Sequence, residues 1–207
     1  MECVWDCLAK ILGFDYSGAP DNSGVKTSFE RNVRFDDALK GKDVKVSKDG
    51  CSVSGNGTCM VKTALHQDKV YWEITVVETG EGKFRLGVCK VAGIKDDLQA
   101  LDDLLGDDRM ADVSWALKSD QCTTLFAGGD TIGISYDQIS GRPQVDFYLN
   151  GDKLPGCSIS GLSGVVCPAV SVTYGVELKG NFSVEDVDFE FLPPAGFSGI
   201  IPSRSMI

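Results

Sequence analysis

Short apolar runs alternate with glycine-bearing turns along most of the chain. Successive residues of YWEITV (71–76) fall on opposite faces of an extended chain, so Trp72, Ile74 and Val76 share one face, as in a half-buried strand. Six segments have this strand-like character: KVYWEITVV (69–77), KFRLGVCKV (83–91), TIGISYD (131–137), QVDFYLNG (144–151), VVCPAVSV (165–172) and VEDVDFEF (184–191). About a dozen such strands with almost no helix predict an all-β fold, a sandwich of two antiparallel sheets.

One turn and one helix interrupt this pattern. Asn150-Gly151 follows the run VDFYL, and both residues accept the positive φ of a type I′ turn, which predicts a β-hairpin. Leucines recur at helical spacing between Asp96 and Leu105 and predict a short acidic helix lying on the sheet. The surrounding aspartates leave two alternatives open: a docking site for a basic segment, and a calcium site, although their spacing does not follow an EF-hand loop.

The first residues follow a different pattern. Apolar side chains within the first dozen positions recur at helical spacing, and the stretch 14–27 is small, polar and broken by Pro20. We therefore expect residues 1–27 to form a helix or tail plus a flexible linker, and residues 28–207 to form the folded domain. Cys3 and Cys7 would share one helical face beside apolar residues, so they are candidates for acylation. A helix docked on its own domain, or a plain tail, is the alternative.

Charge narrows the choice of partners. The chain of 207 residues carries 20 Lys+Arg against 30 Asp+Glu, a net charge of −10, and would be repelled by phosphate backbones. Seven of the aspartates fall between Gly93 and Asp112. We expect no nucleic-acid partner, and contact with a membrane only through acylation of the N-terminal cysteines.

The cysteines and the single histidine limit the chemistry. Glu2 and Asp6 stand where a signal peptide would carry positive charge, so a reducing, cytoplasmic location is expected for the eight cysteines. None of them forms a C-x-x-C pair, which argues against structural zinc. The neighbours of His66, Leu65 and Gln67, supply neither a nucleophile nor the spacing of a metal-binding motif. We therefore expect no enzyme activity and no cofactor.

A rival interpretation assigns chemistry to the last strand-like segment. In VEDVDFEF, Asp186, Asp188 and Glu190 would share one strand face about 6.5 to 7 Å apart, within reach of two-carboxylate glycoside hydrolysis. The simpler interpretation packs Val187, Phe189 and Phe191 inward and leaves the acids in solvent. A carbohydrate-binding or glycoside-hydrolysing sandwich remains the alternative function.

Several motifs together resemble the SPRY domain, a β-sandwich interaction module with a concanavalin-like fold. The motifs stand in the family's order: LHQDKVYWEI (65–74), RLGVCKV (85–91), VSWALKSD (113–120), GGDTIGISYDQ (128–138), VDFYLNG (145–151) and CPAVSV (167–172). The resemblance covers about Val33 to Ile200. It implies a non-catalytic, monomeric adaptor that presents loops at one end of the sandwich to a peptide or protein.

The resemblance also implies where the partner binds. Relatives hold a peptide in a shallow groove built from several loops, and the matching positions here are His66, Gln67, Asp112, Val113, Thr173, Tyr174 and Gly175. Tyr174 is the expected anchor, because a tyrosine in a glycine-bearing turn combines a large apolar face with a polar tip. The alternative is that Tyr174 is a core residue at a strand end. Nearby aspartates would favour a peptide of basic or mixed character.

Overall fold

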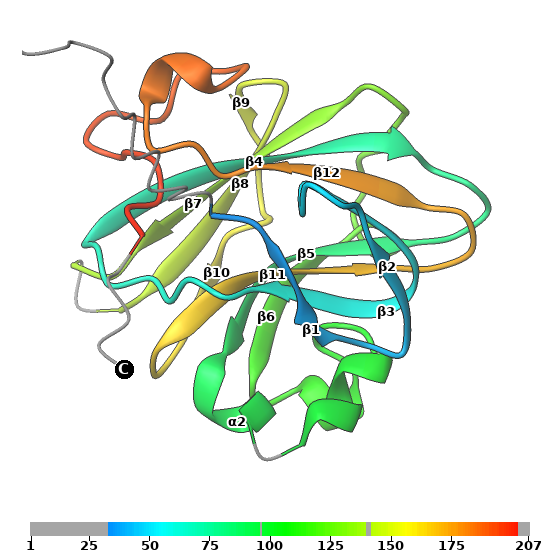
Figure 1. Ribbon diagram of the computed structural model, residues 1–207. Coiled ribbons are helices and arrows are strands. Elements are labelled where there is room, and N and C mark those ends of the chain that lie inside the picture. The colour runs from blue at the N-terminus through cyan, green and yellow to red at the C-terminus, as the bar shows by residue number, and fades with distance from the viewer. Residues whose placement is uncertain (1–32, 96, 140–141, 203–207) are drawn as a thin grey trace, which may run out of the picture. The chain divides into compact units, whose positions relative to one another are not determined.

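The computed structural model describes residues 33–95, 97–139 and 142–202, and within them it is built almost entirely of strands (Figure 1). The strands are β1 (Phe35–Lys40), β2 (Asp43–Val46), β3 (Ser52–Val61), β4 (Lys69–Glu78), β5 (Phe84–Lys90), β6 (Ser114–Lys118), β7 (Thr131–Asp137), β8 (Gln144–Leu149), β9 (Asp152–Lys153), β10 (Ile159–Ser160), β11 (Val166–Val172) and β12 (Glu177–Asn181). They form one curled sheet in the order β10-β8-β7-β4-β12-β3-β11-β5-β6, with β1 and β2 paired to β3 and β9 paired to β8. The predicted all-β antiparallel sandwich is confirmed.

The two layers of the sandwich are continuous because β3 passes from one to the other. Its first half pairs with β2 and β12, and its second half, from Gly57 onward, pairs with β11. Gly55 and Gly57 adopt φ values of 100° and 127° at the crossing, a region that residues with a Cβ rarely occupy. A Cβ on Gly55 would stand 2.2 Å from the carbonyl oxygen of Asp43. The strand can bend there because these two residues are glycines.

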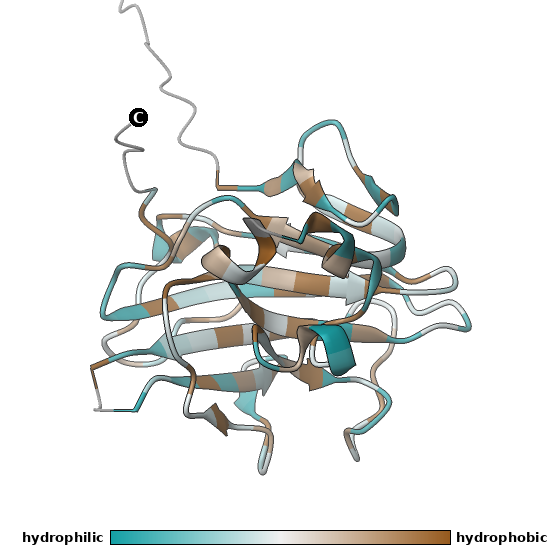
Figure 2. Cartoon of the chain, turned by 90° about the horizontal axis from the view of Figure 1, so that it is seen from below, coloured by the Kyte–Doolittle hydropathy of each residue, from teal (hydrophilic) through white to brown (hydrophobic). Residues whose placement is uncertain are grey.

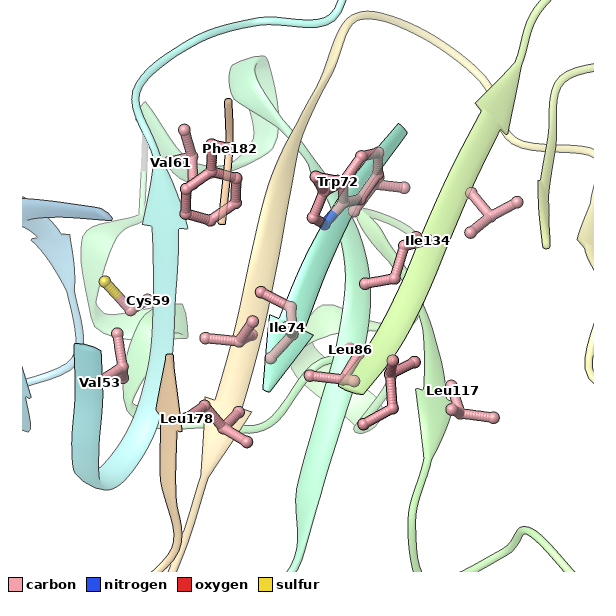
Figure 3. Packing of buried hydrophobic residues seen from close by; sticks show 14 of the residues in the cluster. Val53, Cys59, Val61, Trp72, Ile74, Leu86, Leu117, Ile134, Leu178 and Phe182 are labelled. Carbon is pink, nitrogen blue, oxygen red and sulfur yellow. The ribbon is translucent and has the colours of Figure 1, made fainter. Parts of the chain in front are cut away.

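The main core lies between the two layers (Figure 3). Trp72, Ile74 and Ile134 from one layer pack in the same cluster as Leu86 and Leu117 from the other, and all of these side chains are buried. The predicted inward face of β4 is therefore confirmed. At roughly 25 cal/mol per Å² of apolar surface, this cluster is the main source of folding free energy.

The opposite face of β4 differs from the half-exposed face that the alternation predicts. Tyr71 and Glu73 are each only 1% exposed, because a C-terminal segment, residues 182–202, covers them. The ring of Phe189 packs edge-on against Tyr71 at 5.1 Å, and Ser198 makes a parallel bridge to Val70. This face of β4 is a second buried surface.

Within the C-terminal segment, the predicted strand 184–191 is wrong. Residues Asp186–Asp188 form a 3₁₀ turn, η3, and Val187 is 87% exposed instead of packing inward. Local hydrogen bonds turn the chain: the Ser183 hydroxyl accepts from Glu185 N and donates to the Asp188 carboxylate. Such side-chain bonds compete with strand pairing, and both edges of β4, the strand that this segment covers, are already paired with β7 and β12. The same-face row of acids required for glycoside hydrolysis is therefore absent from this described segment.

The acidic segment lies on the outer face of the β11-β5-β6 layer, as Figures 1 and 2 show. It forms helix α2 (Val91–Lys95) and two 3₁₀ turns, η1 (Leu98–Asp102) and η2 (Asp108–Met110), instead of the single helix predicted from 96 to 105. Its apolar residues join a second cluster with the outward side chains of the sheet: Met60, Cys89, Ile94, Ala100, Leu101, Leu105, Met110, Cys167 and Ala169. The predicted placement on the sheet is therefore confirmed.

Polar contacts fasten the same segment. The side chain of Arg85 is 4% exposed, and its Nη1 donates to Leu105 O at 2.6 Å and to the Asp107 carboxylate at 2.5 Å. Thr58 Oγ1 donates to Asp103 O at 2.7 Å, and Asp102 forms an ion pair with Lys42 at 3.4 Å. The carboxylates of Asp102 and Asp107 thus make contacts within the fold itself.

The structure tests the predicted hairpin turn but not the predictions made for the N-terminal residues. Asn150 and Gly151 adopt φ values of 49° and 90° between β8 and β9, which confirms the predicted hairpin. The predicted helix or tail and linker, residues 1–27, and the candidate acylation sites Cys3 and Cys7 lie outside the described residues. In the described part, no helix is long and apolar enough to cross a membrane.

Candidate functional site: a turn surface at one end of the sandwich

The turn between β11 and β12 holds its backbone in an unusual conformation. Tyr174 has φ +43° and Gly175 has φ +85°, and Val176 N donates to Thr173 O at 3.1 Å to close the turn. A residue with a Cβ pays about 1–2 kcal/mol to adopt the left-handed region. The side chain of Tyr174 is nevertheless 72% exposed, so core packing does not compensate this cost. The alternative that Tyr174 is a core residue is therefore wrong.

Strand β3 and the turn between β4 and β5 hold the backbone around Tyr174. Tyr174 N donates to Asn56 Oδ1 at 3.0 Å, and Tyr174 O accepts from Glu81 N at 3.1 Å. Thr173 Oγ1 accepts from Lys83 N at 2.9 Å and donates to Lys83 O at 3.0 Å. In Figure 1 this turn, in orange, lies beside the turn that joins β4 to β5. The tyrosine ring is thus presented on a rigid support.

A third segment, residues 119–130, completes this end of the sandwich. Ser119 N donates to Phe84 O, Gly129 N donates to Val76 O, and the ring of Phe126 packs against Phe84 at 5.3 Å. Between these anchors Leu125 is 93% exposed. We name the three segments together, residues 77–83, 119–130 and 173–177, the turn surface. It combines the exposed Tyr174 and Leu125 with the partly exposed Val77.

The charges of the turn surface are mainly negative. Glu78 and Glu177 lie directly opposite each other on β4 and β12, an arrangement of like charges that destabilises a sheet. Glu81 is exposed beside them. Lys83 is paired with Asp120 at 3.1 Å. Desolvation raises the pKa of Asp120, but the hydrogen bond and charge of Lys83 outweigh it, so that this pKa lies below its ordinary value.

The other predicted site residues lie at the opposite end of β11. Leu65 N donates to Val166 O, which places His66 and Gln67 near the first residue of β11, whereas Tyr174 follows the last. Six residue steps of about 3.3 Å separate those ends by about 20 Å. Asp112 and Val113 belong to the same far end, because Lys90, the β11 partner of Val166, donates to both of their carbonyl oxygens. The resemblance implied that the seven residues form one groove, and the structure shows that they do not.

At that far end, Gln67 is used internally. Its Nε2 donates to Gly199 O at 3.0 Å, its Oε1 accepts from Ile201 N at 2.7 Å, and its carbonyl oxygen accepts from Gln138 Nε2 at 2.7 Å. These bonds hold the C-terminal segment against the sandwich. His66, in contrast, is exposed.

Two features of the turn surface were missed by sequence reasoning. Leu125 lies in the polar stretch QCTTLFAGGD, where an isolated LF pair is a weak signal for one buried and one exposed apolar side chain. The Glu78–Glu177 pair involves residues 99 positions apart in the chain (177 − 78), and no local pattern indicates that they meet. Pairing across strands of distant sequence brought these groups together.

The rest of the described surface contains no stronger candidate for a binding site. Among the described residues, no three His, Cys, Asp or Glu side chains gather closely enough to hold a metal ion. A cavity of about 490 Å³ lies where β1 meets the turn between β2 and β3, and its lining mixes Arg34, Lys48 and Lys62 with Asp36 and Asp37. The candidate site is the turn surface, where an exposed aromatic ring and mainly negative charge occur together.

Comparison with known proteins agrees with this architecture. A family model for the SPRY domain matches residues 69–185. SPRY domain-containing protein 7 of human and of mouse are each 30% identical to the chain over 173 residues, which cover 82% of this chain and 83% of theirs. The chicken protein of the same name is 29% identical over 174 residues. Among solved structures, the TRIM65 PSpry domain aligns with a TM-score of 0.55 at 16% identity, over 73% of this chain and 93% of that one.

Proposed function

The chain belongs to the SPRY domain family, and from this premise we propose that it is a non-catalytic interaction module whose turn surface binds a peptide segment of a partner protein. One observation carries the proposal: Tyr174 is 72% exposed in a left-handed conformation that hydrogen bonds with Asn56 and Glu81 hold in place. A strained backbone conformation that core packing does not stabilise is typical of binding sites. Exposed tyrosines on rigid supports are frequent anchors of interfaces.

The charge of the turn surface supports a partner segment with basic and apolar residues. A cation between Glu78 and Glu177 would relieve the repulsion that these two side chains impose on neighbouring strands. Leu125 and Tyr174 would take the apolar side chains. Exposed acids also steer a basic segment toward the surface, so association should slow as salt increases. We further propose that the module works as a monomer in the reducing cytoplasm.

A peptide-display selection with the full chain tests this proposal. Selected peptides are expected to combine Lys or Arg with a large apolar residue. For the tightest of them, Tyr174→Ala should weaken binding about 30-fold, equivalent to about 2 kcal/mol, measured by isothermal titration calorimetry. The circular-dichroism spectrum should be unchanged.

His66→Ala is the matched control. It removes an exposed side chain at the opposite end of β11, so affinity should stay the same. The proposal fails if His66→Ala weakens the selected peptides while a folded Tyr174→Ala protein keeps full affinity, or if acidic peptides are selected instead.

A further inference from the structure

Two cysteines far apart in the chain meet beside the core. Cys122 lies in segment 119–130 after β6, and Cys157 lies in the connection between β9 and β10. Their Sγ atoms are 3.7 Å apart. Both cysteines are half-buried and pack against the main core. Each cysteine is therefore partly exposed to solvent, and the two sulfurs are in contact with each other.

The other described thiols lie in different surroundings. Cys59, Cys89 and Cys167 are buried. Desolvation raises the pKa of Cys59 and of Cys89 to about 12, so the reactive thiolate form is scarce at neutral pH. Cys51 is half-buried, and desolvation together with the charge of Asp49 raises its pKa. These thiols are expected to react slowly.

Cys122 differs from all of these. Desolvation raises its pKa, but hydrogen bonds from the Thr124 N–H, the Thr124 hydroxyl, the Cys157 thiol and the Thr123 N–H outweigh it, and the resulting pKa lies below the usual thiol value. Desolvation and the neighbouring Cys122 raise the pKa of Cys157. Of the two thiols, Cys122 therefore loses its proton more readily, and Cys157 lies in contact with it, the arrangement of a reactive and a resolving cysteine.

We propose that Cys122 and Cys157 are a redox modification site: a hydroperoxide oxidises Cys122, and Cys157 resolves the product to a reversible disulfide. This inference is independent of the proposed function, because it concerns contact between two thiols and not the binding of a partner.

The chemistry proceeds in two balanced steps. The Cys122 thiolate attacks one peroxide oxygen, an S–O bond forms, the O–O bond breaks, and the leaving oxygen departs as hydroxide; sulfur is oxidised to a sulfenic acid and the peroxide is reduced. Cys157 then attacks the Cys122 sulfur, an S–S bond forms, the S–O bond breaks, and hydroxide leaves with the Cys157 proton as water. In total, two thiols and one hydrogen peroxide give one disulfide and two waters. A dithiol reductant returns two electrons and two protons.

The structure favours this product over further oxidation. The sulfurs must approach only from 3.7 Å to the roughly 2.0 Å of a disulfide. The bond would close a loop spanning 35 sequence positions that includes β7, β8 and β9. Loop closure of this length restricts the unfolded chain and stabilises the folded one. It would also tie segment 119–130 to the β9–β10 connection.

Mass spectrometry of the reduced full chain tests the inference. Treatment with hydrogen peroxide should remove two hydrogens from the intact mass, and trypsin should release peptides 119–153 and 154–179 as one species. Because the second peptide also contains Cys167, fragmentation of this species should place the bond between Cys122 and Cys157. Dithiothreitol should reverse both changes. The melting temperature of the oxidised form should rise by roughly 5–10 °C.

Two variants assign the roles of the cysteines. In the Cys157→Ser protein, dimedone should trap sulfenic acid at Cys122, whereas the Cys122→Ser protein should show little label at Cys157. Cys51→Ser, which changes a half-buried thiol outside the pair, should oxidise like the unaltered chain. A linkage between other cysteines, irreversible oxidation of Cys122 without a linkage, or equal labelling in the two variants would overturn the inference.

Discussion

The C-terminal segment and the turn surface use polar and aromatic residues in opposite ways. Under the C-terminal segment, Glu73 is 1% exposed and its carboxylate accepts from Tyr71 Oη, from Glu190 N and from Phe191 N. On the turn surface, Tyr174 is 72% exposed and its own backbone, not its ring, makes the hydrogen bonds. The first region uses its distinctive groups to hold the fold together, whereas the second leaves them available to solvent.

This difference shows which residues of the sandwich can recognise a partner. Gln67 is a predicted site residue and Glu73 lies on the face of β4 that the alternation predicts to be exposed, but the side chains of both hydrogen-bond to backbone groups of residues 190–201. Removing such a group leaves buried donors or acceptors unsatisfied, so its replacement is costly for stability. Removing an exposed side chain costs little stability and can still abolish binding.

The largest expected effect is at Glu73. Glu73→Ala leaves the N–H groups of Glu190 and Phe191, each 2.9 Å from the carboxylate, without their acceptor. We expect the free energy of unfolding to fall by about 3–5 kcal/mol, measured by urea denaturation. Glu185→Ala, an exposed acid in the same segment, should change it by less than about 0.5 kcal/mol. Equal effects of the two variants would remove the contrast between the regions.

A smaller change of opposite sign is expected at Tyr174. Tyr174→Gly removes the Cβ that makes φ +43° unfavourable, so the free energy of unfolding should rise by about 1 kcal/mol. Binding of the selected peptide should fall as it does for Tyr174→Ala. The alanine variant keeps a Cβ and should show no comparable gain in urea denaturation. If glycine destabilises the protein, the ring has a structural role and the contrast fails.

The smallest expected effect concerns pH at the turn surface. The pKa of Asp120 lies below its ordinary value of 3.8 when folded, so the Lys83–Asp120 pair stabilises the protein above that value and the contribution is lost as pH falls through the folded pKa. Both side chains are a third or more exposed, which limits the contribution to less than about 0.5 kcal/mol. Asp120→Asn should therefore match the unaltered protein in urea denaturation near pH 2 and be marginally less stable at neutral pH. A loss above about 1 kcal/mol at neutral pH would contradict this.

Strands within the sandwich could be predicted because their pattern is local. Alternation in YWEITV, the apolar run VCPAVSV and the Asn150-Gly151 turn each act within a few residues, and β4, β11 and the β8–β9 hairpin appear where they were expected. The same rule failed at 184–191, where hydrogen bonds of Ser183 and contacts with β4 outweighed an alternating pattern. Alternation alone does not reveal whether a neighbouring strand edge is free.

The candidate site could be predicted only in part. Tyr174 was singled out from its glycine-bearing turn, but residues near Leu65 and Val113 were grouped with it although they lie at the other end of β11. That grouping depends on which ends of the strands meet, and strand order is set by pairings between distant segments. The contact between Cys122 and Cys157 arises in the same way.

By itself, the sequence determined the strand segments, the tight turns, the net charge and the family, because each depends on neighbouring residues, on totals or on motifs in order. Tertiary structure alone decided that Glu73 is buried, that Tyr174, Leu125 and the Glu78–Glu177 pair lie at the same end of the sandwich, and that two thiols touch. Those properties depend on the packing of segments that are distant in the chain. The exposure, charge pairing and reactivity of a side chain are set by the segments packed around it, and the local residue pattern does not specify which segments these are.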